Sequence, residues 1–450
     1  MNVIQLEQQL NDFNPDIRRE ALKELDRLVE AGKIHLPEMQ DVANMHCHTF
    51  FSFNAYGYSP TGLAWLAKKN GYKYMGIVDF DVLDGVEEFL SACDTLQVRG
   101  SAGLETRVFI PEFSSREINS PGEPGIYYTM AIGFIANSVP PSVAPILADM
   151  RRRAEERNRA MVQRLNAYLD PLKIDYDAEV LPLTPAGTAT ERHILVAYQK
   201  AAEKLKGDGV DEFWAEKIGL PVEKISALGK DPAAFQNTLR SKLMKKGGVG
   251  YVKPDAGDFP SIEDVNRMAQ ASGALPCAAW LDGLSTGEQA ITELLEILIR
   301  KGTAALNIVP DRNWNIADEK LKQIKVQNLY DIVKLAKEFD LPLNIGTEMN
   351  SPGQKVMDDF SAPELGPVKE DFIAGAQFIY GHTALARACQ KGYQSDWAKT
   401  HLPARKERNE FYQTLGQLVP PGFKGLLMLK ALPAEASPAE MLSLIKQQVK

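Results

Sequence analysis

The sequence predicts an α/β fold, a (β/α) barrel that carries a helical insertion. Short apolar runs alternate with amphipathic helical stretches along most of the chain, and such alternation is typical of right-handed crossovers and a mainly parallel sheet. Polar side chains of the kinds that bind metal ions follow five of the apolar runs. The alternation stops between residues 174 and 251 and then resumes, which predicts an insertion there.

Eight apolar runs have the length of buried strands. They cover residues 42–45, 74–78, 102–104, 127–134, 275–279, 304–309, 341–345 and 378–380. Seven or eight strand–helix units fit a closed barrel better than an open parallel sheet, which remains the alternative. The chain has 450 residues, and a barrel with an insertion and extensions accounts for that length without further independent domains.

Helical periodicity predicts the helices that connect these strands. They cover residues 60–70, 85–93, 142–169, 261–272, 286–301, 326–339 and 362–374. Residues 1–40 are expected to form an N-terminal helical extension, in which Asn14 caps a helix and Pro15 occupies its first turn. The predicted division of the remaining chain is a barrel of residues 41–173 and 252–400, a helical insertion of residues 174–251 and a C-terminal helical tail of residues 401–450.

The composition argues against several classes of protein. The net charge is −8, and lysine and arginine are interleaved with acidic residues, so nucleic acid is not expected as a partner. The four cysteines lie far apart and form no CxxC pair, which fits a reducing compartment. The sequence has no signal-peptide pattern and no run of 18 apolar residues, so we expect a soluble cytoplasmic protein without a membrane partner.

Immediately after five of the predicted strands come side chains that can bind a metal ion. They are His46 and His48, Asp79 and Asp81, Glu105, Glu348, and His382. Because the carboxyl ends of parallel strands converge on one face of a (β/α) barrel, we expect these side chains to meet at the barrel mouth. His46 and His48 lie two residues apart on a strand, so both imidazoles point to the same side and can reach one ion.

The predicted metal ligands are His46, His48, Glu105, Glu348 and His382. Some have a plainer alternative, since Glu105 can simply pair with Arg107 and His382 can be a structural residue at the start of a helix. Asp79 and His193 are the candidate general bases for a metal-bound water. The alternative for His193 is a structural role, because a lone histidine on a helix of an insertion is more often structural than catalytic.

Three basic side chains are predicted to bind an anionic substrate. They are Arg107, Arg312 and Lys355. The fork of an arginine matches the oxygens of a phosphate ester, although surface charge is the alternative for each residue. The chain has no P-loop and no GxGxxG before a helix, and it has no GxSxG nucleophile motif. Cys47, between two histidines, is expected to be buried in the strand end rather than to attack a substrate.

Three short motifs lie in order between residues 42 and 109. His46-x-His48 is followed by Ser52, residues 76–85 read Gly-Ile-Val-Asp-Phe-Asp-Val-Leu-Asp-Gly, and Gly103 precedes Glu105 by two positions. In order and spacing these motifs resemble the PHP (polymerase and histidinol phosphatase) family, in its small metal-dependent phosphoesterase branch. The resemblance implies a distorted seven-stranded barrel and a metal-dependent phosphoesterase. Beyond residue 109 the similarity is one of topology and weak local matches.

Several ligand positions of that family are substituted in this chain. Phe80 stands where the second motif carries a histidine, and Thr129 is the nearest match to another expected histidine. Residues 278–280, Ala-Ala-Trp, replace an Ala-His-Pro, and Glu348 and Asn350 replace a final aspartate and histidine. We therefore expect one or two divalent ions (Zn, Mn or Fe) rather than three.

The leading hypothesis is a metal-dependent hydrolase, a phosphoesterase that acts on a small anionic substrate through a water activated at the barrel mouth. One alternative is a PHP-like barrel that has lost hydrolysis and binds a ligand or a protein partner. Another is an amidohydrolase-type enzyme that cleaves a C–N bond with the same mouth and fewer ions.

Overall fold

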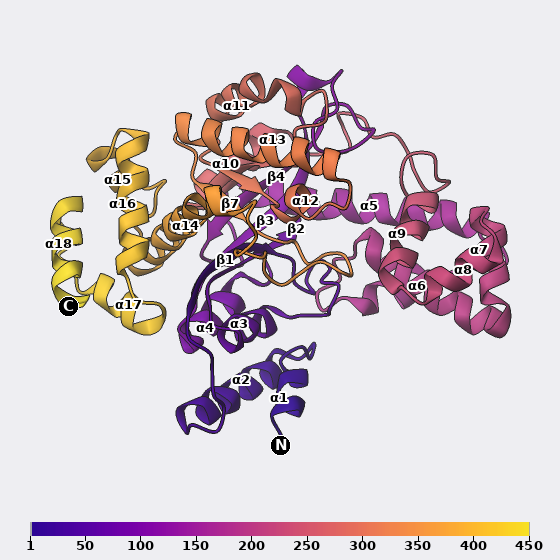
Figure 1. Cartoon of the computed structure of the whole chain (residues 1–450), viewed down its shortest axis with the longest axis horizontal. Coiled ribbons are helices and arrows are strands. Elements are labelled where there is room, and N and C mark those ends of the chain that lie inside the picture. The colour runs from indigo at the N-terminus through magenta and orange to yellow at the C-terminus, as the bar shows by residue number, and fades with distance from the viewer. Residues whose placement is uncertain (1, 450) are drawn as a thin grey trace.

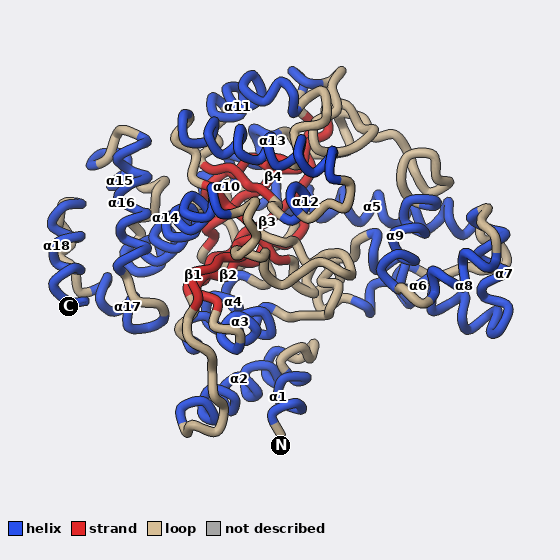
Figure 2. Tube along the Cα trace, viewed as in Figure 1, coloured by secondary structure: helices blue, strands red, loops and turns tan. Residues whose placement is uncertain are grey.

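A seven-stranded sheet forms the centre of an α/β protein (Figures 1 and 2). The computed structural model describes residues 2–449, and its strands follow one another across the sheet in chain order. They are β1 (Gln40–Cys47), β2 (Tyr72–Phe80), β3 (Arg99–Phe109), β4 (Ile126–Phe134), β5 (Leu275–Trp280), β6 (Ala305–Ile308) and β7 (Leu343–Ile345). The predicted α/β fold with a seven-stranded, barrel-like sheet is confirmed.

The sheet curves until its first and last strands nearly meet. The end of β1 and the segment after β7 form an isolated parallel bridge between Cys47 and Glu348. The N–H of His48 donates to the carbonyl of Glu348 at 2.7 Å, and the N–H of Glu348 donates to the carbonyl of His46 at 2.8 Å. These bonds nearly close the barrel, and they fix His46, His48 and Glu348 at the same rim.

One strand departs from the parallel arrangement. β4 runs antiparallel to both β3 and β5, whereas the remaining ladders are parallel. The connection from β3 to β4 holds a short 3₁₀ turn, Pro111–Phe113, where a crossover helix would be needed for a parallel partner. The prediction of parallel strands therefore holds for β1–β3 and for β5–β7 but not at β4.

Amphipathic helices pack against the sheet and correspond to predicted connecting helices. They are α3 (Pro60–Lys69), α4 (Val86–Leu96), α10 (Ile262–Ala271), α11 (Ile291–Arg300) and α13 (Glu319–Glu338), with the single turn α12 (Asp311–Trp314) before α13. α3 and α10 each begin at a capping serine: the side chain of Ser59 accepts from the N–H of Gly62, and that of Ser261 accepts from the N–H of Asp264.

The predicted strand at residues 378–380 is wrong, because this run lies within α14 (Lys369–Cys389). The predicted helix at residues 362–374 also starts too early. α14 is buried on nearly all sides between the sheet and α16 (Arg405–Leu418). A helix buried all round carries no amphipathic signal, and a short apolar run within it cannot be distinguished from a strand by periodicity.

A second hydrophobic core lies in the helical region on the right of Figure 1. It runs from Met161 in the second half of α5 (Ala144–Tyr168) to Met244, and it includes the fully buried Trp214. The other helices of this region are α6 (Glu191–Lys206), α7 (Val210–Ile218), α8 (Val222–Gly229) and α9 (Pro232–Leu243). The exact limits of the insertion, residues 174–251, stay a prediction.

Helices also flank the barrel at both ends of the chain. The N-terminal pair is α1 (Val3–Gln9) and α2 (Pro15–Glu30), and the side chain of Asn14 caps α2 as predicted. The C-terminal group is α15 (Asp396–His401), α16, α17 (Gly422–Lys430) and α18 (Pro438–Val449). Among residues 2–449, no helix combines the length and the apolar character that a membrane crossing requires.

Candidate metal centre at the barrel mouth

Two histidines and a glutamate meet inside the rim of the barrel. His46 lies in β1, His48 follows directly after it, and Glu105 lies on β3. Oε2 of Glu105 is 3.5 Å from Nε2 of His46 and 3.1 Å from Nε2 of His48. One ligand atom from each of the three buried side chains lies within 4.8 Å of the other two. The structure thus brings together three of the five predicted metal ligands.

Four polar atoms of this group have no hydrogen-bond partner among the residues that the structure describes. They are Nδ1 and Nε2 of His46, Nε2 of His48 and Oε2 of Glu105. Leaving a buried polar atom without a partner costs roughly 1–3 kcal/mol, and native proteins rarely do so. Two imidazole nitrogens and a carboxylate are also the ligand set of mononuclear zinc and iron(II) sites with open positions. The residues present therefore fit one divalent ion.

A hydrogen-bonded relay orients His48 toward this group. The hydroxyl of Ser52 donates to Oδ1 of Asp79 at 2.6 Å, so its oxygen accepts from Nδ1 of His48 at 3.0 Å. Asp79 also accepts from the N–H and the hydroxyl of Thr49, each at 2.7 Å. With its proton on Nδ1, His48 presents the lone pair of Nε2 to Glu105, which is the orientation that a metal ligand needs.

This relay changes the role of Asp79, which the sequence predicted as a general base. Both of its oxygens are bonded to Thr49 and Ser52, it is 2% exposed, and it does not line the cavity at the barrel mouth. Its position is that of a residue that holds His48 in place. The sequence missed this role because the Ser52 link appears only when the loop after β1 folds back over β2.

The charges of the group favour a bound cation. Burial acts to raise the pKa of Glu105, but His46 and His48 outweigh it and hold that pKa at about 2. Burial acts to lower the pKa of His48, and Glu105 and Asp79 outweigh it and raise that pKa. Glu105 is thus an ionised carboxylate that faces two imidazoles from within the protein interior.

Phe80 occupies the side of the group where the PHP resemblance implies a histidine. Its ring stacks on the imidazole of His48, with centroids 4.5 Å apart and an interplanar angle of 24°. An aromatic ring cannot bind a divalent ion through a lone pair, so Phe80 adds shape and an apolar wall to the site. This position limits the ligands that a second ion would find nearby.

Glu348, a predicted ligand, lies at the same rim but is held by other partners. Its Oε2 accepts from Nη2 of Arg312 at 2.5 Å and from Nε2 of Gln354 at 3.0 Å. Burial acts to raise the pKa of Glu348, while Arg312 and His46 together hold it below its usual range. The backbone of Glu348 has a φ of 64°, which is uncommon for a residue with a side chain. Glu348 therefore forms an ion pair with Arg312 beside the three-ligand group.

His382 does not reach the barrel mouth, so its predicted role as a ligand is not supported by its position. It lies on α14, where Nδ1 accepts from the N–H of Tyr393 at 3.0 Å and Nε2 donates to the carbonyl of Gly133 at 3.3 Å. Both ring nitrogens are therefore occupied. The misplacement follows from the misread apolar run at residues 378–380, which is helix rather than strand.

His193 and Lys355 also lie outside the cavity wall. Nδ1 of His193 accepts from the N–H of Thr190 and helps to cap α6, while its ring packs edge-on against Phe53. Burial lowers the pKa of His193 to about 3, so the imidazole is neutral near pH 7. Lys355 lies over the ring of Trp314 and is 3.6 Å from Asp311. Neither position supports the role that the sequence predicted.

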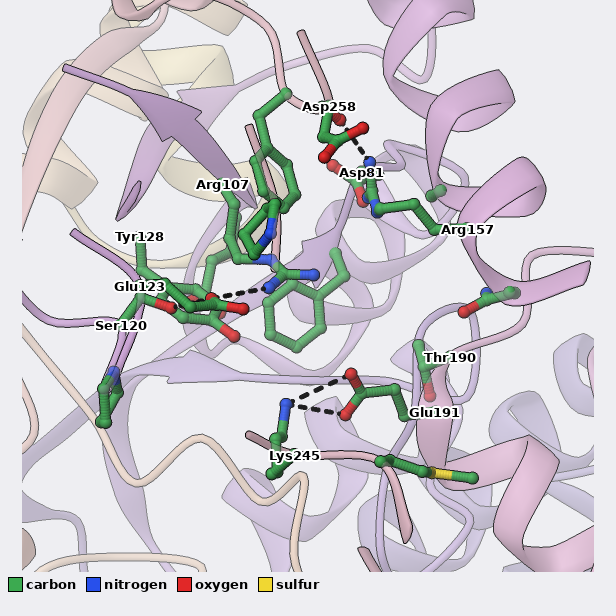
Figure 3. A pocket seen from close by; sticks show the side chains of 18 of the residues that line it. Asp81, Arg107, Ser120, Glu123, Tyr128, Arg157, Thr190, Glu191, Lys245 and Asp258 are labelled. Carbon is green, nitrogen blue, oxygen red and sulfur yellow. Dashed lines mark hydrogen bonds and ion pairs between the residues drawn. The ribbon is translucent and has the colours of Figure 1, made fainter. Parts of the chain in front are cut away.

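A large cavity of about 1150 Å³ opens above the three-ligand group, between the barrel mouth and the insertion. Glu105 is the member of the three-ligand group that lines the cavity. Glu348, Phe80 and the predicted substrate-binding residues Arg107 and Arg312 line it as well. Figure 3 shows part of this cavity, with Arg107, Arg157, Glu191 and Lys245 among the labelled side chains. Its lining also includes several cations that the sequence did not single out. They are Arg152, Arg153, Arg157, Arg164, Arg192, Arg240, Lys245 and Lys246.

Arg157 illustrates why these cations were missed. The neighbouring arginines at residues 151–153 are followed by two glutamates, a pattern that is typical of a solvated helix face. Arg152 fits that interpretation, since it pairs with Asp149 and Glu156. Arg157 lies further along the same helix and turns toward the barrel, a direction that depends on how α5 crosses the mouth.

Comparisons with known proteins give a distant likeness of fold. No family model matches the chain, and no curated protein sequence matches it. Among solved structures, an amidohydrolase from Chromobacterium violaceum with bound sulfate and no metal has a TM-score of 0.49 and 15% identity, over 73% of this chain and 96% of that one. A "putative metal-dependent phosphoesterase" from Bifidobacterium adolescentis has a TM-score of 0.45 and 19% identity, over 75% of this chain and 98% of that one. At these scores, the functional assignment must rest on the side chains of this chain.

Proposed function

We propose that this protein is a mononuclear metal-dependent hydrolase that acts on a phosphoester of a small anionic substrate. The observation that carries the proposal is the convergence of His46, His48 and Glu105, whose facing atoms are buried and have no hydrogen-bond partner among residues 2–449. A divalent ion held by these residues would act as a Lewis acid and would lower the pKa of a water, which is the usual source of the nucleophile in such hydrolases.

The residues around the proposed ion have separate tasks. Ser52 and Asp79 hold His48 with Nε2 directed at the ion position, and Phe80 closes one side with an apolar ring. Arg312 reaches the same rim while paired with Glu348. Its guanidinium can turn a second N–H toward a substrate oxygen, because the side chain is 43% exposed and lines the cavity.

The cavity supports an anionic substrate. Its lining contains ten arginine and lysine side chains and eight carboxylates, a small excess of positive charge in a chain whose net charge is −8. A small excess of positive charge in a cleft of an acidic protein favours a small anion over nucleic acid, whose binding needs an extended basic surface. Phosphate oxygens are the partners that arginine forks match best.

A catalytically impaired barrel is the second candidate, and two observations favour it. Phe80 replaces one possible ligand, and Arg312 engages the carboxylate of Glu348. If these changes had removed hydrolysis, the same mouth would still bind an anionic ligand. Cleavage of a C–N bond is a third outcome that the test below distinguishes.

The first test is the metal content of the protein purified without chelator, measured by elemental mass spectrometry. We expect about one equivalent of Zn, Mn or Fe in the wild type and a loss of that metal in Glu105→Gln and in the His46→Ala/His48→Ala double variant. Glu123→Gln is the matched control, because Glu123 lines the same cavity but pairs with Arg107 rather than with the histidines. A wild-type protein that binds neither native nor added metal would overturn the proposal.

Activity is then measured on p-nitrophenyl phosphate and on a panel of small phosphoesters and amides, with each metal added. Turnover of phosphoesters that disappears in Glu105→Gln supports the proposed reaction. Turnover of amides alone favours the C–N hydrolase. A protein that binds metal but hydrolyses neither class is the impaired barrel.

A further inference from the structure

Two arginines share one aromatic ring in the cavity between the barrel and the insertion. The guanidinium carbon of Arg107, on β3, lies 4.4 Å from the ring centroid of Phe259, and that of Arg157, on α5, lies 4.5 Å from it. All three side chains line the cavity, and Figure 3 shows both arginines there with Asp81 and Asp258. The stacked group therefore combines Arg107 from the barrel, Arg157 from the helix that leads into the insertion, and Phe259 from the segment that returns from it.

The positive charge of this pair is only partly balanced. Arg107 has one ion pair, a long contact of 3.3 Å from Nη1 to Oε2 of Glu123. Arg157 forms no ion pair within the part of the chain that the structure describes, and its Nη1 donates to the backbone carbonyl of Asp258 at 2.8 Å. The carboxyl of Asp81 lies close enough for its charge to act on both arginines, and it accepts from the hydroxyl of Thr106 at 2.6 Å.

The positive charges of the two guanidinium groups also repel each other. Burial first, and the nearby charge of Arg107 second, lower the pKa of Arg157 to about 10. Both groups nevertheless remain charged near pH 7. Like charges that are held together by stacking and left with unused N–H groups are stabilised when an anion binds between them.

We propose that Arg107 and Arg157 form an anion-binding subsite, and that the substrate carries a second anionic group, a phosphate or a carboxylate, besides the phosphoester that reacts. This inference rests on the proposed function for the identity of the reacting group. Arg107 follows Glu105 by two residues on β3, so both side chains project from the same face of the strand. Two residues of a strand span about 7 Å, which places the second anionic group within the reach of a small molecule.

The subsite determines specificity rather than chemistry. A planar fork stacked on Phe259 keeps a fixed orientation, so each arginine can offer two N–H groups to one anion without losing much side-chain freedom. Phosphoesters without a second anionic group are expected to bind the cavity weakly. They would lack the contact with the two arginines both in the bound substrate and in the transition state. The loss of this contact is therefore expected to raise KM more than it lowers kcat.

The test is isothermal titration of the full-length protein with inorganic phosphate, and in parallel with malonate, in the presence of chelator. We expect Arg157→Gln to raise the Kd for the anion that binds by at least tenfold and Arg157→Lys to fall between it and the wild type. The matched control is Arg152→Gln, which removes a cavity-lining arginine of the same helix that is already paired with Asp149 and Glu156. Its Kd is expected to stay within twofold of the wild type.

Thermal melts followed by circular dichroism show whether each variant is folded. Dependence on Arg157 with phosphate, with malonate or with both supports the subsite and identifies the anion that it prefers. A wild type that binds neither anion at millimolar concentration, or a folded Arg157→Gln that binds as the wild type does, would overturn the inference. Because chelator removes any metal, this result is independent of the metal content and turnover that test the proposed function.

Discussion

At the scale of single residues, the most telling contact is the hydroxyl of Ser52 between His48 and Asp79. It fixes which imidazole nitrogen of His48 carries the proton, and outer contacts of this kind typically change metal affinity by about 10–100-fold. We therefore predict that Ser52→Ala weakens metal binding by roughly that factor while the fold stays intact. The measurement is competitive titration with a chromogenic zinc chelator.

Ser101→Ala is the matched control for this prediction. Ser101 is likewise a buried serine of the barrel, but its hydroxyl bonds to Thr383 on α14, away from the metal ligands. Its removal is expected to leave the affinity for zinc unchanged. Equal affinities in Ser52→Ala and the wild type would show that the relay does not orient His48.

The candidate site could be predicted from the sequence where its parts are close along a strand. His46 and His48 share the end of β1, and Glu105 lies on the face of β3 that turns to them, so strand geometry alone brings the three together. Glu348 and Arg312 are different, because their ion pair depends on how two loops after β6 and β7 approach each other. No local pattern in the sequence records that approach.

At the scale of elements, α14 shows both why one prediction was wrong and how the fold depends on small residues. Its glycines allow the helix to approach its neighbours closely: a Cβ on Gly381 would lie 2.0 Å from the carbonyl oxygen of Tyr412 on α16, and one on Gly375 would lie 1.9 Å from that of Leu343 on β7. Such contacts are tertiary. The sequence therefore displayed only an apolar run with glycines, which is equally typical of a short strand.

The close approach of α14 and α16 gives a prediction about stability. Gly381→Ala must push the two helices apart, because backbone atoms rather than flexible side chains stand in the way. We expect the free energy of unfolding to fall by about 1–3 kcal/mol or more. The measurement is urea unfolding followed by circular dichroism.

Gly229→Ala on α8 is the control for that change. Nothing lies within 4 Å of the position of its added Cβ, so the substitution is expected to be neutral or to stabilise the helix by roughly 0.5–1 kcal/mol. A Gly381→Ala protein as stable as the wild type would mean that α14 and α16 are not packed as closely as described.

At the scale of the whole molecule, the barrel and the insertion have separate hydrophobic cores and share one cavity. The ligand group lies on the barrel, whereas most of the cations that line the cavity belong to α5 and to the residues after it. In the proposed function, this division separates the group that carries the reaction from the side chains that recognise the substrate. It also explains why the strand pattern predicted the candidate metal site, while most of the cations that line the cavity, whose positions depend on how the insertion is placed, were missed.

Global stability should depend on pH through the buried His382. Burial is the main cause that lowers its pKa from 6.5 to about 4, and its neutral ring bonds to Tyr393 and Gly133. Between about pH 6.5 and 4, the unfolded chain therefore carries a proton on His382 that the folded chain does not carry. Its contribution is fully present above pH 6.5 and is lost as the pH falls, by about 3 kcal/mol in total.

Two buried carboxyl groups change the stability with pH in the opposite direction. The effect of His382 must therefore be measured as the difference in stability between the wild type and a His382 variant. Burial raises the pKa of Glu288 and of Asp358 to about 7, so their contribution is lost as the pH rises toward 7. We therefore compare unfolding free energies of the wild type and His382→Asn between pH 4 and 7. The variant should be less stable at pH 7, and this deficit should shrink toward pH 4, whereas His401→Asn, at an exposed site, should track the wild type. A deficit that is the same at both pH values would show that His382 is not held as the neutral imidazole on which the packing of α14 against Gly133 depends.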